Sequence, residues 1–168
     1  MVSRDWHFFM SKTSKILVFP GSFDPFTLGH LDIVNQSLKW CDHLIVLVAH
    51  HPQKKSWLTI EQKSRAFHSL FESEPRVEVV FWDGLLVDFL LSNTLDTVVR
   101  GLRNANDYQY ELQLLEMHRQ LFPEIKMMWI QSSQEHRELS SSFIREVHQY
   151  GRQINEWVPE SFLLEIET

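Results

Sequence analysis

The segment 20–30, PGSFDPFTLGH, carries residue types suited to chemistry on a phosphate group. It follows the short apolar run 15–20, typical of a buried strand, and leads into a helical pattern. Free backbone N–H groups and the helix dipole favour anions at such a junction. Gly21 allows close backbone approach, Ser22 offers an N–H and a hydroxyl, and His30 lies in the first helical turn. The segment therefore predicts a phosphate-binding loop, with a Gly/Pro-rich loop bearing a surface histidine as the alternative.

Three further groups of polar residues follow apolar runs. Lys54 comes after the second run, Arg100 and Arg103 after the fourth, and Ser140–Ser142 after the fifth. The planar fork of arginine suits phosphate oxygens, and serines at a helix start can cap it or help to hold an anion. Taken alone, each group has a plainer interpretation as solvated charges, surface ion pairs or a helix cap.

The elements that must position these residues alternate along the chain. Apolar runs predict strands at 15–20, 43–49, 76–81, 96–100 and 125–130, and helical patterns cover 31–41, 85–92, 108–122, 140–150 and 158–166. One more helix opens at Thr59, with Gln62 completing a capping box, and Gly101 is expected to turn the chain after the fourth strand. We therefore expect an α/β fold, a doubly wound five-stranded parallel sheet covered on both faces. Ligands bind such sheets at the carboxyl ends of the strands.

Composition limits the classes of function. The net charge of −6 argues against broad nucleic-acid binding. No run of 18 apolar residues exists, so no membrane span is expected. The single cysteine, Cys41, cannot form an internal disulfide, and no Cys/His spacing suits a metal, so a cytoplasmic protein without its own metal ligands is expected. We expect residues 1–14 to be a flexible extension and residues 15–168 to form one domain.

The segment Thr27-Leu28-Gly29-His30 resembles the Thr-or-His-x-Gly-His signature of the nucleotidyltransferase superfamily. Threonine at position 27 is similar to the phosphopantetheine adenylyltransferase branch, and the likeness runs from about residue 15 to 162. The resemblance implies a Rossmann-like nucleotidyltransferase fold. It also implies transfer of an adenylyl group from ATP to 4′-phosphopantetheine, giving dephospho-coenzyme A and pyrophosphate in coenzyme A biosynthesis.

The resemblance also implies roles for individual residues. His30 would stabilise charge on the attacked α-phosphate as the catalytic residue. Acceptor contacts would come from Ser22, Lys54, Leu86 and Arg100, with Leu85 beside them. ATP contacts would come from Ser22, Phe23, His30, Gly101, Leu102, Arg103, Glu111, His136, Arg137, Glu138, Leu139, Ser140, Ser141 and Ser142. Mg²⁺ would be held mainly by the ATP phosphates, and the assembly would be a homohexamer.

Two positions depart from the family pattern, and two other functions stay open. His118 stands where asparagine is usual, and His136 where an aromatic residue is common. A sister enzyme, such as a nicotinamide-mononucleotide adenylyltransferase or a glycerol-phosphate cytidylyltransferase, is disfavoured by Thr27 and by the block 100–103. A non-catalytic nucleotide-binding module on the same fold is disfavoured by the intact His30, Lys54 and Arg100.

Overall fold

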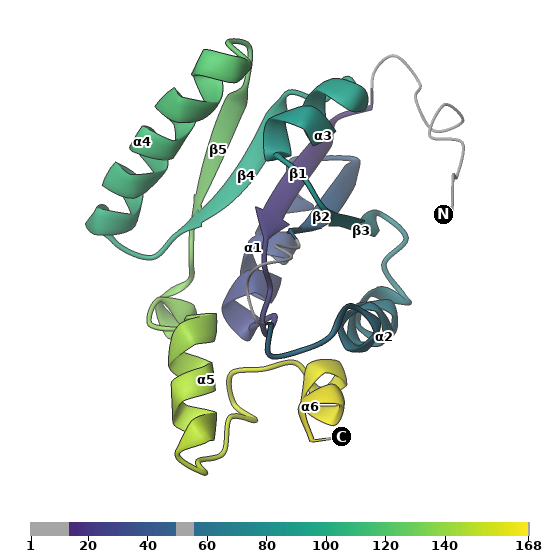
Figure 1. Ribbon diagram of the computed structural model, residues 1–168, viewed down its shortest axis with the longest axis vertical. Coiled ribbons are helices and arrows are strands. Elements are labelled where there is room, and N and C mark those ends of the chain that lie inside the picture. The colour runs from purple at the N-terminus through teal and green to yellow at the C-terminus, as the bar shows by residue number, and fades with distance from the viewer. Residues whose placement is uncertain (1–13, 50–55, 168) are drawn as a thin grey trace.

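The computed structural model describes residues 14–49 and 56–167, which form a five-stranded parallel sheet with helices on both faces (Figure 1). The strands are β1 (Ile16–Gly21), β2 (His43–Ala49), β3 (Val77–Trp82), β4 (Thr97–Leu102) and β5 (Lys126–Gln131). The helices are α1 (Leu28–Ser37), α2 (Ile60–Phe71), α3 (Leu86–Ser92), α4 (Ala105–Leu121), α5 (Ser141–Gln149) and α6 (Glu160–Ile166). The expected doubly wound, five-stranded parallel sheet is confirmed.

The strand order β3-β2-β1-β4-β5 creates a switch point between β1 and β4. The chain first builds outward from β1 to β3 and then crosses to the other side of β1, and each neighbouring pair is parallel. Crossovers leave β1 and β4 in opposite directions, so a crevice opens at their carboxyl ends. In Figure 1, α5 and α6 lie at the end of the molecule toward which the β1 arrow points.

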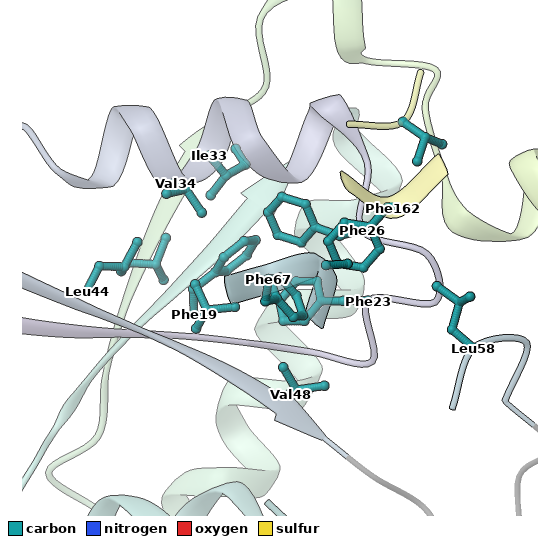
Figure 2. Packing of buried hydrophobic residues seen from close by; sticks show 14 of the residues in the cluster. Phe19, Phe23, Phe26, Ile33, Val34, Leu44, Val48, Leu58, Phe67 and Phe162 are labelled. Carbon is teal, nitrogen blue, oxygen red and sulfur yellow. The ribbon is translucent and has the colours of Figure 1, made fainter. Parts of the chain in front are cut away.

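Two apolar clusters hold the layers together, one on each face of the sheet. Alternate strand residues point to opposite faces, so Leu17 and Phe19 join one cluster while Val18 joins the other. The larger cluster takes residues from α1, α2, α5 and α6, and the smaller takes residues from α3 and α4. In Figure 2 the rings of Phe26, Phe67 and other phenylalanines gather in the larger cluster. Burial of both faces explains the continuous apolar character of the central strands.

The expectation that Gly101 turns the chain is wrong. Gly101 lies within β4 and is paired in register with Ile130 of β5, so Arg100 and Arg103 do not flank a tight turn. A Cβ atom on Gly101 would lie 3.0 Å from Cγ1 of Ile33 on α1. The missing side chain therefore lets α1 pack closely on the strand.

Two helices begin earlier than their apolar spacing predicts. α1 starts after Thr27, before its apolar pattern begins at residue 31, which confirms the place of His30 in the first turn, and α4 starts after Asn104 rather than at residue 108. Both caps are polar side chains that accept N–H groups of the first turn, which apolar periodicity does not register. The capping box of Thr59 and Gln62 on α2 is confirmed. No helix in the described ranges has the length and apolar character needed to cross a membrane.

A buried carboxylate anchors the loop between β1 and α1. Asp24 accepts the N–H groups of Trp57 (2.7 Å) and Leu58 (3.0 Å), and Nζ of Lys63 lies 3.1 Å from its Oδ1. Lys63 also donates to the carbonyl of Ser22 at 3.0 Å. Burial raises the pKa of Asp24, but the backbone N–H groups and Lys63 outweigh it, so the pKa lies below its usual value.

Replacing Asp24 with alanine should lower the free energy of unfolding by about 3–5 kcal/mol, because the buried Lys63 ammonium would lose its partner. Urea denaturation of the wild type and of Asp24→Ala measures this. Because the pKa of Asp24 is lowered on folding, its contribution is present above its unfolded value of 3.8 and fades as pH falls through the folded value. The difference between the two proteins should therefore shrink in acid.

An exposed ion pair serves as the matched control. Asp96→Ala breaks the contact with Lys126 at the surface, where such pairs contribute at most about 1 kcal/mol. If Asp24→Ala costs no more than Asp96→Ala, the anchoring role of Asp24 is wrong.

Candidate active site

A pocket of about 350 Å³ opens at the switch point beyond the carboxyl ends of β1 and β4. Of the predicted site residues, it brings together Ser22, Phe23, His30, Arg100, Gly101, Arg103, Glu111, His136, Leu139, Ser140 and Ser141. Residues from the two ends of the chain thus meet in one concave site, as expected for this sheet.

Other predicted site residues lie elsewhere. Leu86, Leu102, Arg137, Glu138 and Ser142 do not line the pocket, and Lys54 lies outside the described residues. Leu86 opens α3 and packs against the smaller apolar cluster, and the neighbouring Leu85 is exposed. For these residues the roles implied by the family resemblance stay predictions.

His30 is held by the first turn of its own helix. The hydroxyl of Thr27 accepts the backbone N–H of His30 at 3.2 Å, and the Thr27 N–H donates to Nδ1 of His30 at 3.0 Å. Since Nδ1 accepts this hydrogen bond, the proton of the neutral ring is placed on Nε2. Thr27 therefore fixes both the orientation and the tautomer of the imidazole, leaving Nε2–H as a donor.

The surroundings of His30 keep its ring uncharged. Burial, with smaller contributions from the positive charges of Arg103 and Arg100, lowers the pKa of His30 from 6.5 to about 4. Aromatic rings also surround it, with centroids of Phe23 and Phe26 5.2 and 5.3 Å away. The ring thus packs more closely than its first-turn position predicts. At pH 7 it acts as a neutral hydrogen-bond donor rather than a cation.

Phe23 lines the base of this pocket. Its φ of 45° lies in the left-handed region, and its ring is buried among Phe19, Phe26 and Phe67 (Figure 2). A Cβ on Gly21 would lie 2.8 Å from this ring. Gly21 therefore makes room for Phe23, a contact that the spacing of the loop did not predict.

Arg100 is fixed between β4 and α4. Its Nε and Nη2 donate to the two carboxylate oxygens of Glu111 at 2.9 and 2.7 Å, and its Nη1 donates to the carbonyl of Pro20 at 3.0 Å. Glu111 is only 5% exposed, so this bidentate pair is well shielded from solvent. The guanidinium is therefore held at the end of β1, close to the loop that carries Ser22.

Arg103 forms a second bidentate pair, with an acidic residue that lies one turn before Glu111 on α4. Its Nε and Nη2 lie 2.9 and 3.2 Å from the oxygens of Asp107, which also accepts the Arg103 backbone N–H at 3.0 Å. Asp107 lines the pocket but is not among the predicted site residues. The signal was present in the i, i+4 spacing of an arginine and an acid around a helix start.

The N-terminus of α5 closes one wall of the pocket. Ser140 caps the helix by accepting the N–H of Phe143 at 3.1 Å, and the Ser141 hydroxyl donates to the carbonyl of Pro25 at 2.8 Å. Arg145 donates to the carbonyl of Asp24 at 2.6 Å and to the hydroxyl of Ser142. The helix end is thus tied to the first loop, and its first-turn N–H groups provide an environment that favours anions.

Gly29 and His136 meet where α1 passes the short 3₁₀ helix Gln134–His136. A Cβ on Gly29 would lie 3.4 Å from Oγ1 of Thr27 and 3.5 Å from the backbone oxygen of His136, which are ordinary van der Waals distances. His118 on α4 does not line the pocket, although burial lowers its pKa. Ser132, Tyr110 and Ile33 line the pocket as well and were not predicted.

The carboxylates of the pocket are unsuited to binding a metal ion. Asp107 and Glu111 are each occupied by an arginine. Across residues 14–49 and 56–167, no group of three or more His, Cys, Asp or Glu side chains could hold a metal ion. The geometry favours anions, with two arginines, a helix N-terminus and a neutral imidazole N–H.

Comparison with known proteins agrees with this geometry. The cytidylyltransferase-like family matches residues 18–147. A phosphopantetheine adenylyltransferase from Thermotoga neapolitana is 38% identical over 143 residues, covering 85% of this chain and 89% of the relative. Enzymes of the same name from Alkaliphilus oremlandii and Thermosynechococcus vestitus are 38% and 36% identical, covering 86% and 90% of this chain and 92% and 90% of their own lengths.

Nuclear magnetic resonance should find His30 neutral at pH 7, with its proton on Nε2 and its pKa near 4 rather than 6.5. The reason is burial beside two arginines, with the Thr27 N–H bound to Nδ1. Ring ¹⁵N shifts followed during a pH titration measure both properties, and a His30→Gln spectrum assigns the signals. A protonated ring at pH 7, or a proton on Nδ1, would contradict this picture.

Proposed function

The chain belongs to the phosphopantetheine adenylyltransferase family within the cytidylyltransferase-like proteins, and from this premise we propose that it catalyses adenylyl transfer from ATP to 4′-phosphopantetheine. The products are dephospho-coenzyme A and pyrophosphate, in coenzyme A biosynthesis. The observation that carries the proposal is the convergence of His30, Arg100, Arg103 and the α5 N-terminus on one pocket of a Rossmann-like nucleotidyltransferase fold.

The reaction is an in-line displacement at phosphorus. An oxygen of the acceptor 4′-phosphate attacks the α-phosphorus of ATP, the bond from that phosphorus to the oxygen bridging to the β-phosphate breaks, and pyrophosphate leaves. No covalent intermediate with the protein is needed. Such transfers depend mainly on positioning and on stabilisation of charge, which the pocket residues are suited to provide.

His30 is the residue proposed to act on the transition state. Its Nε2–H would donate to a non-bridging oxygen of the α-phosphate as negative charge builds there. The ring is already oriented by Thr27, so little reorganisation is required when the acceptor attacks. Because the ring is neutral at pH 7, we assign it hydrogen-bond donation rather than proton transfer.

In this proposal, the two arginines contact different substrates. Arg100, beside Ser22 and the end of β1, would contact the acceptor phosphate together with Lys54. Arg103 and the α5 N-terminus would contact the ATP phosphates, supported by helix N–H groups and positive charge at one wall of the pocket. The remaining ATP contacts predicted from the resemblance, including those of residues 136–139, belong to the same proposal.

The proposal also includes a Mg²⁺ ion and an oligomeric state. A Mg²⁺ ion would neutralise charge on the triphosphate, held by phosphate oxygens and water because the pocket carboxylates are paired with arginines. A homohexamer is proposed from the family resemblance.

Purified protein should release pyrophosphate when ATP and 4′-phosphopantetheine are both present, and not when either is omitted. A coupled pyrophosphate assay measures this, and mass spectrometry should identify dephospho-coenzyme A. Nicotinamide mononucleotide with ATP, and glycerol phosphate with CTP, are the matched controls for the sister activities. If a control pair reacts and phosphopantetheine with ATP does not, the proposed acceptor is wrong.

Replacing His30 with glutamine should lower kcat by on the order of 10²–10³, the loss typical of one transition-state donor. The KM for ATP should change far less, because the contact is formed mainly in the transition state. Glutamine at this position can still accept the Thr27 N–H and keep the capping box. Steady-state kinetics and thermal unfolding provide the measurements.

The alanine variant separates catalysis from packing. His30→Ala should lose as much kcat as His30→Gln and should also melt at a lower temperature, because the side chain that accepts the Thr27 N–H and the ring contacts are both removed. A folded glutamine variant with near-normal kcat would remove His30 from the mechanism.

A further inference from the structure

Asp107 poses an electrostatic problem in a pocket proposed to bind a triphosphate. It lies in the first turn of α4 and lines the pocket, and its side chain is 21% exposed. Burial raises its pKa, but hydrogen bonds from Arg103 outweigh that effect, so the pKa lies below its usual value and the group is ionised at pH 7. A carboxylate here should repel the phosphates of ATP, so its presence in the pocket needs an explanation.

The contacts of Asp107 point to such a role. It binds Arg103 through Nε and Nη2 of the guanidinium and through the backbone N–H. Within residues 14–49 and 56–167, every hydrogen bond recorded for the Arg103 side chain ends on Asp107. These bonds use one edge of the planar fork, so Nη1 still has donors for a ligand.

Arg103 needs such a partner because of its place in the fold. It follows the end of β4, in the short segment before α4, and its side chain is 38% exposed. A long side chain in this setting loses much conformational freedom when it must hold one orientation for a ligand. Asp107 is itself fixed, since its backbone N–H is bound by the Asn104 cap at 3.0 Å. The helix start thus provides a rigid support for the arginine.

We propose that Asp107 is a positioning residue, which holds the guanidinium of Arg103 in place for the ATP phosphates. The proposal rests on the proposed function, because it takes ATP as the ligand of Arg103. It makes a counterintuitive prediction: removing this negative charge from the anion pocket weakens ATP binding. If Asp107 merely opposed the phosphates, its removal would tighten binding.

The test is a double-mutant cycle read by calorimetry with ATP. Asp107→Asn should raise the Kd for ATP at least about fivefold, the scale of coupling between side chains in direct contact. In the Arg103→Met background there is no guanidinium to orient and only the repulsion remains. There the same change should leave ATP affinity unchanged or improve it. A further loss of affinity in that background would overturn the proposal.

Kinetics and a helix control separate positioning from general destabilisation. Asp107→Asn should raise the KM for ATP while that for phosphopantetheine stays near the wild-type value. Leu115→Ala removes a buried contact of the same helix with the smaller apolar cluster, two turns along α4 from Asp107, so it should lower the melting temperature and leave ATP affinity near normal. If Leu115→Ala reproduces the loss of ATP affinity, Asp107 acts through helix stability and the proposal is wrong.

Failure of this inference is distinguishable from failure of the proposed function. ATP binding that is unchanged or tighter in folded Asp107→Asn overturns the positioning role, even while the wild type releases pyrophosphate from ATP and phosphopantetheine. Absence of that release from the wild type counts against the function itself. The binding cycle still decides the positioning role, because it needs only ATP.

Discussion

The pocket depends on the buried anchoring of the loop between β1 and α1. Asp24 ties this loop to the segment before α2, and Lys63 reaches from α2 to the same loop. From the opposite side, Ser141 and Arg145 of α5 donate to the carbonyls of residues 25 and 24. Three loop carbonyls are therefore satisfied by side chains of two helices that lie far apart in the chain. This arrangement places His30, the residue proposed to be catalytic, on one side of the loop and the N-terminus of α5 on the other.

Charge in the pocket is arranged before any ligand binds. Two arginines without anions would repel each other and would be free to point elsewhere. Glu111 and Asp107, four residues apart on α4, pair with Arg100 and Arg103 and aim both forks at one site. The same arginines help to keep His30 neutral, so its donor is defined at pH 7. Orientation and electrostatics are thus linked through one face of α4.

Most of the scaffold could be predicted from the sequence because its signals are local. The strand β2 matches the apolar run 43–49, and Thr59 with Gln62 caps α2 as its residue types indicate. The starts of α1 and α4 could not be found from apolar spacing, since polar caps begin them. Gly101 was wrongly expected in a turn because a glycine in a strand and a glycine in a turn look alike until the packing of Ile33 is known.

The sequence by itself determined the parallel sheet and the place of the loop after its first strand, and the family resemblance pointed to many of the residues that meet in the pocket. The sheet and the loop follow from apolar periodicity, cap chemistry and turn residues, which act over a few residues. Only the tertiary structure decided which nitrogen of His30 carries its proton, which acid holds each arginine and where Arg145 binds. These features depend on burial and on partners up to 121 positions away, such as the contact between Arg145 and Asp24. Local sequence cannot specify them, because the protonation state and the orientation of a side chain are set by the groups that the fold brings around it.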